Sequence, residues 1–261
     1  MRLSFVIPAY NEEGYLPACL ESILPQAQKL GDDVEIVVVN NASTDRTREV
    51  ALRYSGVRVV DELRKGLTFA RQAGFAATTG ELIANVDSDS RLTTGWVDKA
   101  LKAFSEQPNL VTLSGPLVYY DLTPRQRFSV QIFYVIALLV YGFNRYIIRA
   151  GSMVQGGNFV LRRDALEKIG GFDTSISFYG EDTDIARRMN QVGMVRWTLR
   201  LKMFSSARRL KHEGSFTMAW RYALNYFWTT FRKKPYTHHY TDIREQSPAA
   251  YDSPPTKKPK A

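Results

Sequence analysis

The chain has 261 residues, 44% of them hydrophobic, which is enough for one domain with a substantial core. Its single cysteine, Cys19, excludes an internal disulfide framework and favours a reducing compartment, and we expect it to be a small core residue. The net charge is +9, and residues 196–234 hold ten basic residues and one acid, which predicts an anionic partner for that segment. No signal peptide is predicted, because the apolar run at 3–10 is too short.

Strand and helix patterns alternate through the first half of the chain. Apolar and β-branched runs predict strands at 3–7, 35–39, 57–60 and 82–86. Apolar residues at helical spacing predict helices from about Gly14 to Pro25 and from 67 to 77. This alternation predicts an α/β fold with a doubly wound, mostly parallel sheet.

The end of the fourth predicted strand carries Asp87, Ser88 and Asp89. In open α/β sheets, ligands bind outside the carboxyl ends of the strands. Two carboxylates one residue apart can hold a hard divalent cation, which in turn can hold a diphosphate. A solvated turn at the strand end is the alternative for an isolated Asp-x-Asp pair.

The first two predicted strands also end in polar residues. A planar base could lie against Pro8 and Tyr10, with Asn40 or Asn41 reading its edge as donor and acceptor. A simple turn after the first strand and a helix cap at 43–45 are the ordinary alternatives. The recurrence of such residues at successive strand ends favours a nucleotide site.

Taken together and in order, these motifs resemble those of glycosyltransferase family two, the inverting enzymes of the GT-A fold. The resemblance covers residues 3 to 210. It is carried by Phe5-Val6-Ile7-Pro8-Ala9-Tyr10-Asn11-Glu12, Val37-Val38-Val39-Asn40-Asn41-Ala42-Ser43-Thr44-Asp45, Lys65-Gly66, Ala70-Arg71-Gln72-Ala73-Gly74, Asp87-Ser88-Asp89, Gly156-Gly157-Asn158, Gly170-Gly171-Phe172-Asp173 and Tyr179-Gly180-Glu181-Asp182-Thr183-Asp184.

The resemblance implies a nucleotide-diphosphate sugar donor, a magnesium or manganese ion and a general base. The donor-binding residues that it implies are Pro8, Ala9, Tyr10, Glu12, Asn40, Asn41, Lys65, Gly66, Arg71, Asp87, Ser88 and Asp89. The implied metal ligands are Asp89 and Asp87, with His212 as a further candidate that could equally be a surface residue. The implied acceptor-side residues are Gly156, Gly157, Asn158 and Glu181, and the implied base is Asp182.

A base is required because the acceptor hydroxyl must lose a proton as it attacks the anomeric carbon. Asp182 also suits the first turn of a helix, where a carboxylate stabilises the N-terminus, so a capping role is the alternative. Asn40 departs from the acidic residue that the family commonly uses to accept the imide proton of uracil. An amide oxygen can still accept that proton, without charge assistance, so a uridine donor remains the expectation.

We expect a GT-A domain over residues 1–215, with a nucleotide-binding half at 1–115 and an acceptor half at 116–215. The uncharged run 132–143 is too short to span a membrane and is expected to be buried or to lie at a membrane surface. A basic, aromatic segment follows at 216–245, with a disordered tail at 246–261. Within it, a predicted helix has five apolar residues on one face: Trp220, Leu224, Phe227, Trp228 and Phe231. This face could bind a membrane surface, or alternatively pack onto the domain.

The sequence therefore predicts a metal-dependent, inverting glycosyltransferase that moves a sugar from a UDP-linked donor to an acceptor hydroxyl of a lipid-linked or cell-envelope saccharide. We expect it in the cytoplasm or peripherally on the inner face of the cell membrane, without a nucleic-acid partner. One rival is a non-catalytic protein that binds anionic lipid or nucleic acid through the basic segment. Another is a nucleotidyltransferase, but the first strand lacks the glycine- and basic-rich loop that would hold a triphosphate.

Overall fold

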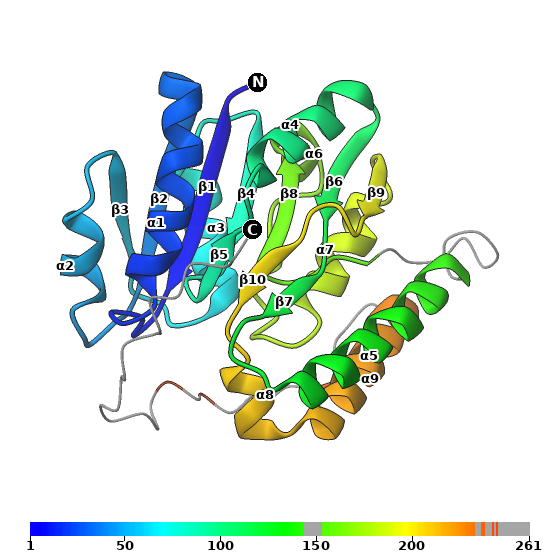
Figure 1. Ribbon diagram of the computed structural model, residues 1–261. Coiled ribbons are helices and arrows are strands. Elements are labelled where there is room, and N and C mark those ends of the chain that lie inside the picture. The colour runs from blue at the N-terminus through cyan, green and yellow to red at the C-terminus, as the bar shows by residue number, and fades with distance from the viewer. Residues whose placement is uncertain (144–152, 233–235, 238–241, 243, 245–261) are drawn as a thin grey trace.

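The computed structural model describes residues 1–143, 153–232, 236, 237, 242 and 244. A seven-stranded sheet in the order β3-β2-β1-β4-β8-β6-β9 forms the centre, and a three-stranded sheet, β5-β10-β7, lies beside it (Figure 1). The strands are β1 (Leu3–Ala9), β2 (Val34–Asn41), β3 (Val57–Glu62), β4 (Leu82–Val86), β5 (Ser90–Leu92), β6 (Leu110–Ser114), β7 (Leu117–Tyr119), β8 (Asn158–Arg162), β9 (Met194–Trp197) and β10 (Met203–Ser205).

The described helices are α1 (Leu16–Ala27), α2 (Thr47–Leu52), α3 (Leu67–Ala77), α4 (Trp96–Glu106), α5 (Pro124–Phe143), α6 (Arg163–Lys168), α7 (Glu181–Met189), α8 (Arg208–Glu213) and α9 (Ser215–Arg232), with a short 3-10 helix at Gln28–Asp33. The four strands and two helices predicted in the first half are all present. The predicted mostly parallel α/β fold is confirmed, since β1, β2, β3 and β4 pair in parallel.

Both faces of the sheet are covered, because alternate strand residues point to opposite sides. Phe5 and Ile7 pack with α1 and α4, where Cys19 is fully buried as expected and burial raises the pKa of its thiol. Val6 packs on the other side against α3 and α7. Burial on both faces accounts for the continuous apolar character of β1, whose seven residues are all buried.

Strand β8 runs antiparallel to both β4 and β6, between which it is inserted. Its apolar pattern is that of any buried strand, and such a pattern does not depend on whether the strand runs parallel or antiparallel to its neighbours. The insertion matters for the site, because the chain enters β8 through Gly156 and Gly157 beside the end of β4. There the backbone N–H of Asp87 donates to the carbonyl of Gly157 at 3.4 Å.

Helix α5 corrects the expectation for the 132–143 run. The helix begins at Pro124 and has 20 residues, so by length and composition it could cross a membrane, whereas the apolar run alone is too short. The alternative of a buried helix is wrong, because Ile132, Val135 and Leu139 are 47%, 57% and 69% exposed.

Glu35 ties the start of β1 and β2 to the turn that precedes β4. Its carboxylate accepts hydrogen bonds from the Ser4 hydroxyl at 2.7 Å and from the backbone N–H groups of Thr79 and Gly80 at 2.6 and 3.1 Å. Burial alone would raise its pKa, but these hydrogen bonds prevail and lower it to about 2. The folded state therefore favours the ionised form.

We expect Glu35→Gln to lower the free energy of unfolding at pH 7 by about 1–2 kcal/mol, because the amide replaces one carboxylate acceptor by a donor. A folded-state pKa of about 2, against 4.5 for the unfolded chain, gives stability that is present above pH 4.5 and is lost as the pH falls towards 2. Urea denaturation across this range should show the difference between variant and parent shrinking with acid. Glu106→Gln, at the exposed last residue of α4, is the control; equal losses from both variants would contradict the assignment.

Candidate active site

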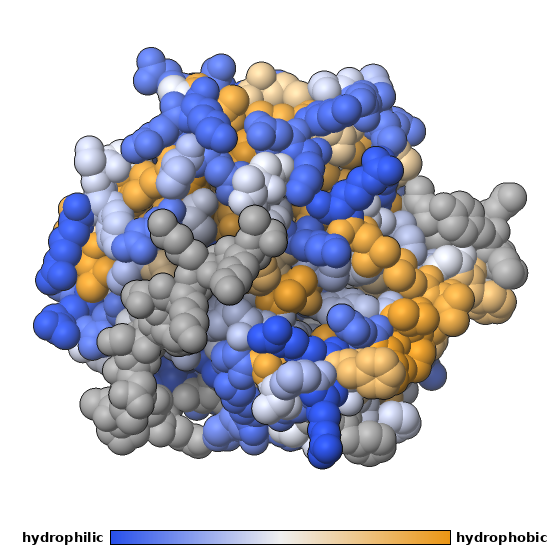
Figure 2. Space-filling view, in the orientation of Figure 1, coloured by the Kyte–Doolittle hydropathy of each residue, from blue (hydrophilic) through white to orange (hydrophobic). Residues whose placement is uncertain are grey.

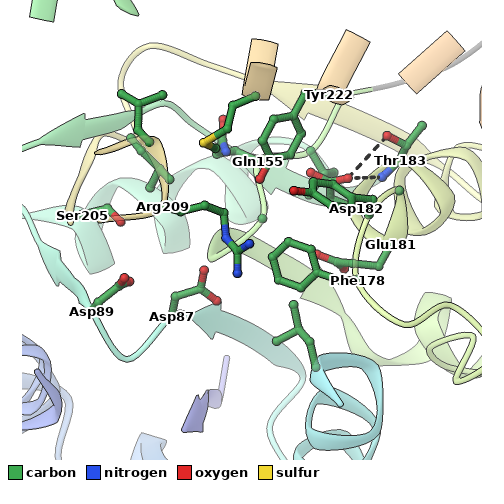
Figure 3. A pocket seen from close by; sticks show the side chains of 18 of the residues that line it. Asp87, Asp89, Gln155, Phe178, Glu181, Asp182, Thr183, Ser205, Arg209 and Tyr222 are labelled. Carbon is green, nitrogen blue, oxygen red and sulfur yellow. Dashed lines mark hydrogen bonds between the residues drawn. The ribbon is translucent and has the colours of Figure 1, made fainter. Parts of the chain in front are cut away.

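A cavity of about 600 Å³ lies at the carboxyl ends of β1, β2 and β4 and continues between α5 and α9. Its polar end is lined by residues from the strand ends and from α3, α7 and α8 (Figure 3). The predicted site residues that line it are Pro8, Ala9, Tyr10, Asn41, Lys65, Gly66, Arg71, Asp87, Ser88, Asp89, Gly156, Glu181 and Asp182.

Asp87 and Asp89 both face the cavity from the segment that follows β4 (Figure 3). Asp89 Oδ2 lies 3.0 Å from Arg208 Nε. Burial, with the negative charges of Glu12 and Asp87, raises the pKa of Asp89 to about 6, although Arg208 opposes the shift. An added divalent cation would relieve this unfavourable concentration of negative charge.

Glu12 lies beneath this pair rather than in the cavity lining. Its carboxylate is fully buried and contacts Arg208 and Arg244, the latter at 2.7 Å. Burial opposes its ionisation, but the two guanidinium groups prevail and hold its pKa below the ordinary value. Both arginines line the cavity, so Glu12 acts on it by positioning two cations.

Arg71 on α3 joins the donor side of the cavity to α7. Its side chain is 1% exposed, lies 3.4 Å from Asp87 Oδ1 and forms an ion pair with Glu181. Burial raises the pKa of Glu181 to about 7, and Arg71 opposes that rise. A buried arginine with two carboxylate partners fixes the position of both.

Asp182 is the second residue of α7 and points into the cavity (Figure 3). Its Oδ1 accepts hydrogen bonds from the backbone N–H of Thr183 at 2.8 Å and from the Thr183 hydroxyl at 3.4 Å. Burial raises its pKa above the ordinary value, and hydrogen bonds from Thr183 and the Gly156 backbone, with the charge of Arg71, oppose the rise. The carboxylate therefore combines a fixed orientation with an increased affinity for a proton.

Gly157 is required by the packing around Asp87. Its φ of +74° is rare for residues with a side chain, and a Cβ there would lie 2.2 Å from Asp87 Oδ2. The glycine thus leaves room for the carboxylate at the cavity wall.

At the polar end of the cavity, beside the carboxyl end of β1, Lys65 lies over the ring of Tyr10. Its Nζ is 4.2 Å from the ring centroid, 2.9 Å from the Tyr10 hydroxyl and 2.8 Å from Asp242. Asn41 shapes the adjoining loop, since its amide donates to the carbonyls of Glu62 and Arg64 and accepts from the N–H of Gly66.

Five predicted residues do not line the cavity: Glu12, Asn40, Gly157, Asn158 and His212. Asn40 donates its amide to Asp61 at 2.8 Å instead. Asn158 is fully buried, accepts from the Trp96 indole at 3.1 Å and donates to backbone carbonyls, which is a structural role. His212 is exposed on α8, and within the described parts of the chain no group of three His, Cys, Asp or Glu side chains is arranged to hold a metal.

Several residues that line the cavity were not predicted as site residues: Tyr119, Phe178, Arg208, Arg209, Tyr222 and Arg244. Arg209 extends into the cavity with its guanidinium 4.3 Å from the Phe178 ring centroid (Figure 3). The basic pair Arg208 and Arg209 was visible in the sequence as part of the charged segment. Only the fold shows that α8 directs them at the acidic strand end.

This arrangement also corrects the interpretation of the positive charge. Much of the excess in 196–234 is paired within the protein: Arg208 contacts Glu12 and Asp89, Arg209 and Arg221 both contact Glu213 at 2.7 Å, and Lys211 contacts Asp121 at 3.0 Å. An anionic partner is therefore not needed to account for these four basic residues.

Comparisons with known proteins agree with this geometry. The sequence model described as "Glycosyl transferase family 2" matches residues 4–170, and that described as "N-terminal domain of galactosyltransferase" matches residues 144–213. A curated relative, the glucosyl-dolichyl phosphate glucuronosyltransferase of Haloferax volcanii, is 22% identical over 69% of this chain and 59% of its own. Several other curated relatives are 31–33% identical over shorter stretches, and the chain spans only 15–32% of their length.

Two solved structures share the fold. The mannosyltransferase PcManGT from Pyrobaculum calidifontis, in complex with GDP-Man and Mn²⁺, superposes with a TM-score of 0.66 at 21% identity, over 89% of this chain and 63% of that one. Glucosyl-3-phosphoglycerate synthase from Mycobacterium tuberculosis, with Mn²⁺ and UDP-glucose, gives 0.59 at 20% identity, over 88% and 78%.

The fold is that of the glycosyltransferase class with the GT-A architecture. Because the family model covers well over half of the sequence, the chain belongs to glycosyl transferase family 2. The family predicted from the motifs is thereby confirmed.

Proposed function

We propose that the chain transfers a sugar from a nucleotide-diphosphate donor to an acceptor hydroxyl with inversion at the anomeric carbon. The observation that carries this proposal is the single cavity that joins two strand-end carboxylates, Asp87 and Asp89, to the buried carboxylate Asp182. Asp87 and Asp89 would hold the diphosphate through a divalent cation, and Asp182 would face the attacking hydroxyl.

On the donor side, Pro8 and Tyr10 would contact the base, and Lys65 would lie beside it. The cations Arg208 and Arg244 would face the diphosphate from the other side, held in place by Glu12. Asn40 donates to Asp61, and both amide hydrogens of Asn41 are used by the carbonyls of Glu62 and Arg64. The backbone of the 62–66 loop would therefore read the edge of the base. We keep a uridine donor as the proposal, with the UDP-glucose complex of a structural neighbour in support.

A divalent cation fits the acidic strand end. Asp87 and Asp89 supply hard oxygen ligands, Gly157 leaves the space that Asp87 needs, and Mn²⁺ is present in two structural neighbours. The remaining ligands would be diphosphate oxygens and water. When bound, magnesium or manganese would offset the negative charge that develops on the leaving diphosphate.

The remaining residues would serve the acceptor. Asp182 would take the proton of the attacking hydroxyl, oriented by Thr183 and Gly156. Arg71 would keep Asp87 and Glu181 at a fixed separation across the cavity. Because Asp182 is next to Glu181 in sequence, this would also keep the base at a fixed distance from the donor. The acceptor is proposed to be a lipid-linked saccharide used at the cytoplasmic face of a membrane, supported by the dolichyl phosphate named in one relative.

The test is a panel of nucleotide sugars screened by thermal stabilisation with and without manganese. We expect one uridine-linked sugar to raise the melting temperature only in the presence of the metal, because diphosphate and metal bind together. Stabilisation by a guanosine-linked sugar alone would reassign the base and leave the enzyme class intact. If no nucleotide stabilises the protein, while nucleic acid binds with a steep salt dependence, the non-catalytic rival would replace the proposal.

A further inference from the structure

The cavity does not end at the catalytic carboxylates. Beyond Asp182 it continues between α5 and α9, where it is lined mainly by apolar and aromatic side chains. Helix α5 contributes Tyr134, Val140 and Tyr141 among others, and α9 contributes Met218, Tyr222 and Ala223. We call this part the α5–α9 channel. A sugar is polar and would gain little from so long an apolar lining. The channel therefore indicates that the acceptor has a second part, which is apolar.

The outer faces of the same two helices are apolar and exposed. Figure 2 shows hydrophobic surface on the side of the molecule where α5 lies. The exposed residues are Phe128, Ile132, Val135, Leu139 and Phe143 on α5, and Trp220, Trp228 and Phe231 on α9. Ile136 and Phe227 also line the channel and are half exposed, so they lie where the channel meets the outer surface. A patch of this extent is uncommon on a soluble monomer and marks a binding surface.

The charges around the patch indicate what covers it. Neither helix contains an aspartate or a glutamate. Arg125 and Arg127 are exposed at the start of α5, and Arg232 is exposed at the end of α9, 5.5 Å from the Trp228 ring. Apolar and aromatic side chains bordered by basic residues, with no acid, are complementary to an anionic bilayer surface.

We propose that the acceptor carries a long alkyl or isoprenoid chain, that this chain lies in the α5–α9 channel, and that the outer faces of α5 and α9 rest in an anionic membrane. The proposal rests on the proposed function, because the chain's polar head would have to reach Asp182. Under this proposal the membrane-bound acceptor and the water-soluble donor enter the cavity by different routes. The lipid chain enters from the side of α5 and α9, and the nucleotide enters at the strand ends. Arg209, between the two ends, is placed to meet a phosphate that joins the lipid to its sugar.

The channel is tested by binding of dodecyl phosphate and butyl phosphate, below their micelle-forming concentrations. The longer chain should bind at least about 100-fold more tightly, because each of its eight additional methylenes contributes to affinity when it is buried. Ala223→Trp, which fills the channel, should remove that difference, whereas Ala76→Trp on the exposed side of α3 should preserve it. Equal affinity of the parent protein for both probes would overturn the channel assignment.

The membrane face is tested by flotation with vesicles of phosphatidylglycerol and phosphatidylethanolamine. Leu139→Glu should weaken vesicle binding by at least about tenfold, while Leu52→Glu, at an exposed site on α2 on the opposite side of the molecule from α5 (Figure 1), should not. A parent protein that ignores these vesicles at low salt would overturn the membrane proposal, as would a stable dimer in which Leu139 is protected. Nucleotide-sugar stabilisation, measured on the same samples, separates failure of this proposal from failure of the proposed function.

Discussion

Replacing Asp182 by asparagine should lower turnover by about two to four orders of magnitude while leaving donor binding almost unchanged. Asparagine keeps the size of the side chain and an oxygen that can accept the hydrogen bonds from Thr183 and Gly156. It cannot take the proton of the acceptor hydroxyl. Initial rates with saturating donor, together with donor affinity from the nucleotide-dependent melting shift, would separate these two effects.

The competing role for Asp182, as a cap for α7, predicts something different. Asparagine caps a helix about as well as aspartate, so a capping role would leave both turnover and melting temperature near their parental values. The pH dependence provides a second criterion. Burial raises the pKa of Asp182, so the acid limb of the rate profile should lie at a higher pH than an ordinary aspartate would give, and it should disappear in the variant. A variant that keeps near-normal turnover would return Asp182 to the capping role.

The nucleotide half was predictable because its signals are local. Buried parallel strands read as continuous apolar runs, and polar residues directly after them must lie at the same edge of the sheet. Asp87, Asp89 and Tyr10 were located in this way, and all three line the cavity. The predicted helix over 67–77 agrees residue for residue with α3, whose amphipathic pattern is uninterrupted.

What could not be predicted depends on contacts between distant segments. Arg208 meets Glu12 across 196 residues of sequence, and Arg244 reaches the same carboxylate from further still. A run of charged residues has the same sequence pattern whether it faces water, a membrane or a buried acid. The pairing of Lys211 with Asp121, 90 residues away, could therefore not be predicted either. The direction of β8 could not be predicted either, since side-chain alternation is identical in parallel and antiparallel strands.

Asp89 is the position at which the proposed metal is most directly tested. We expect Asp89→Ala to abolish the manganese-dependent part of the stabilisation by the donor nucleotide, and to weaken manganese affinity by at least about 100-fold. The fold should survive, because Arg208 keeps Glu12 as a partner when Asp89 is removed. The measurement is the melting temperature with nucleotide, with and without manganese, over a range of metal concentrations.

Asp98→Ala supplies the matched control, since it removes one exposed carboxylate from the start of α4, outside the cavity lining, with the same change in net charge. If both variants lose the same small amount of manganese response, the effect is one of general electrostatics rather than ligation. If Asp89→Ala retains the full response, Asp89 is only the partner of Arg208, and the cation-binding role falls to Asp87 or to the nucleotide alone. A metal site at the end of β4 requires that the manganese-dependent stabilisation is lost in Asp89→Ala and kept in Asp98→Ala. It also requires that the nucleotide affinity of Asp89→Ala in the absence of metal is unchanged.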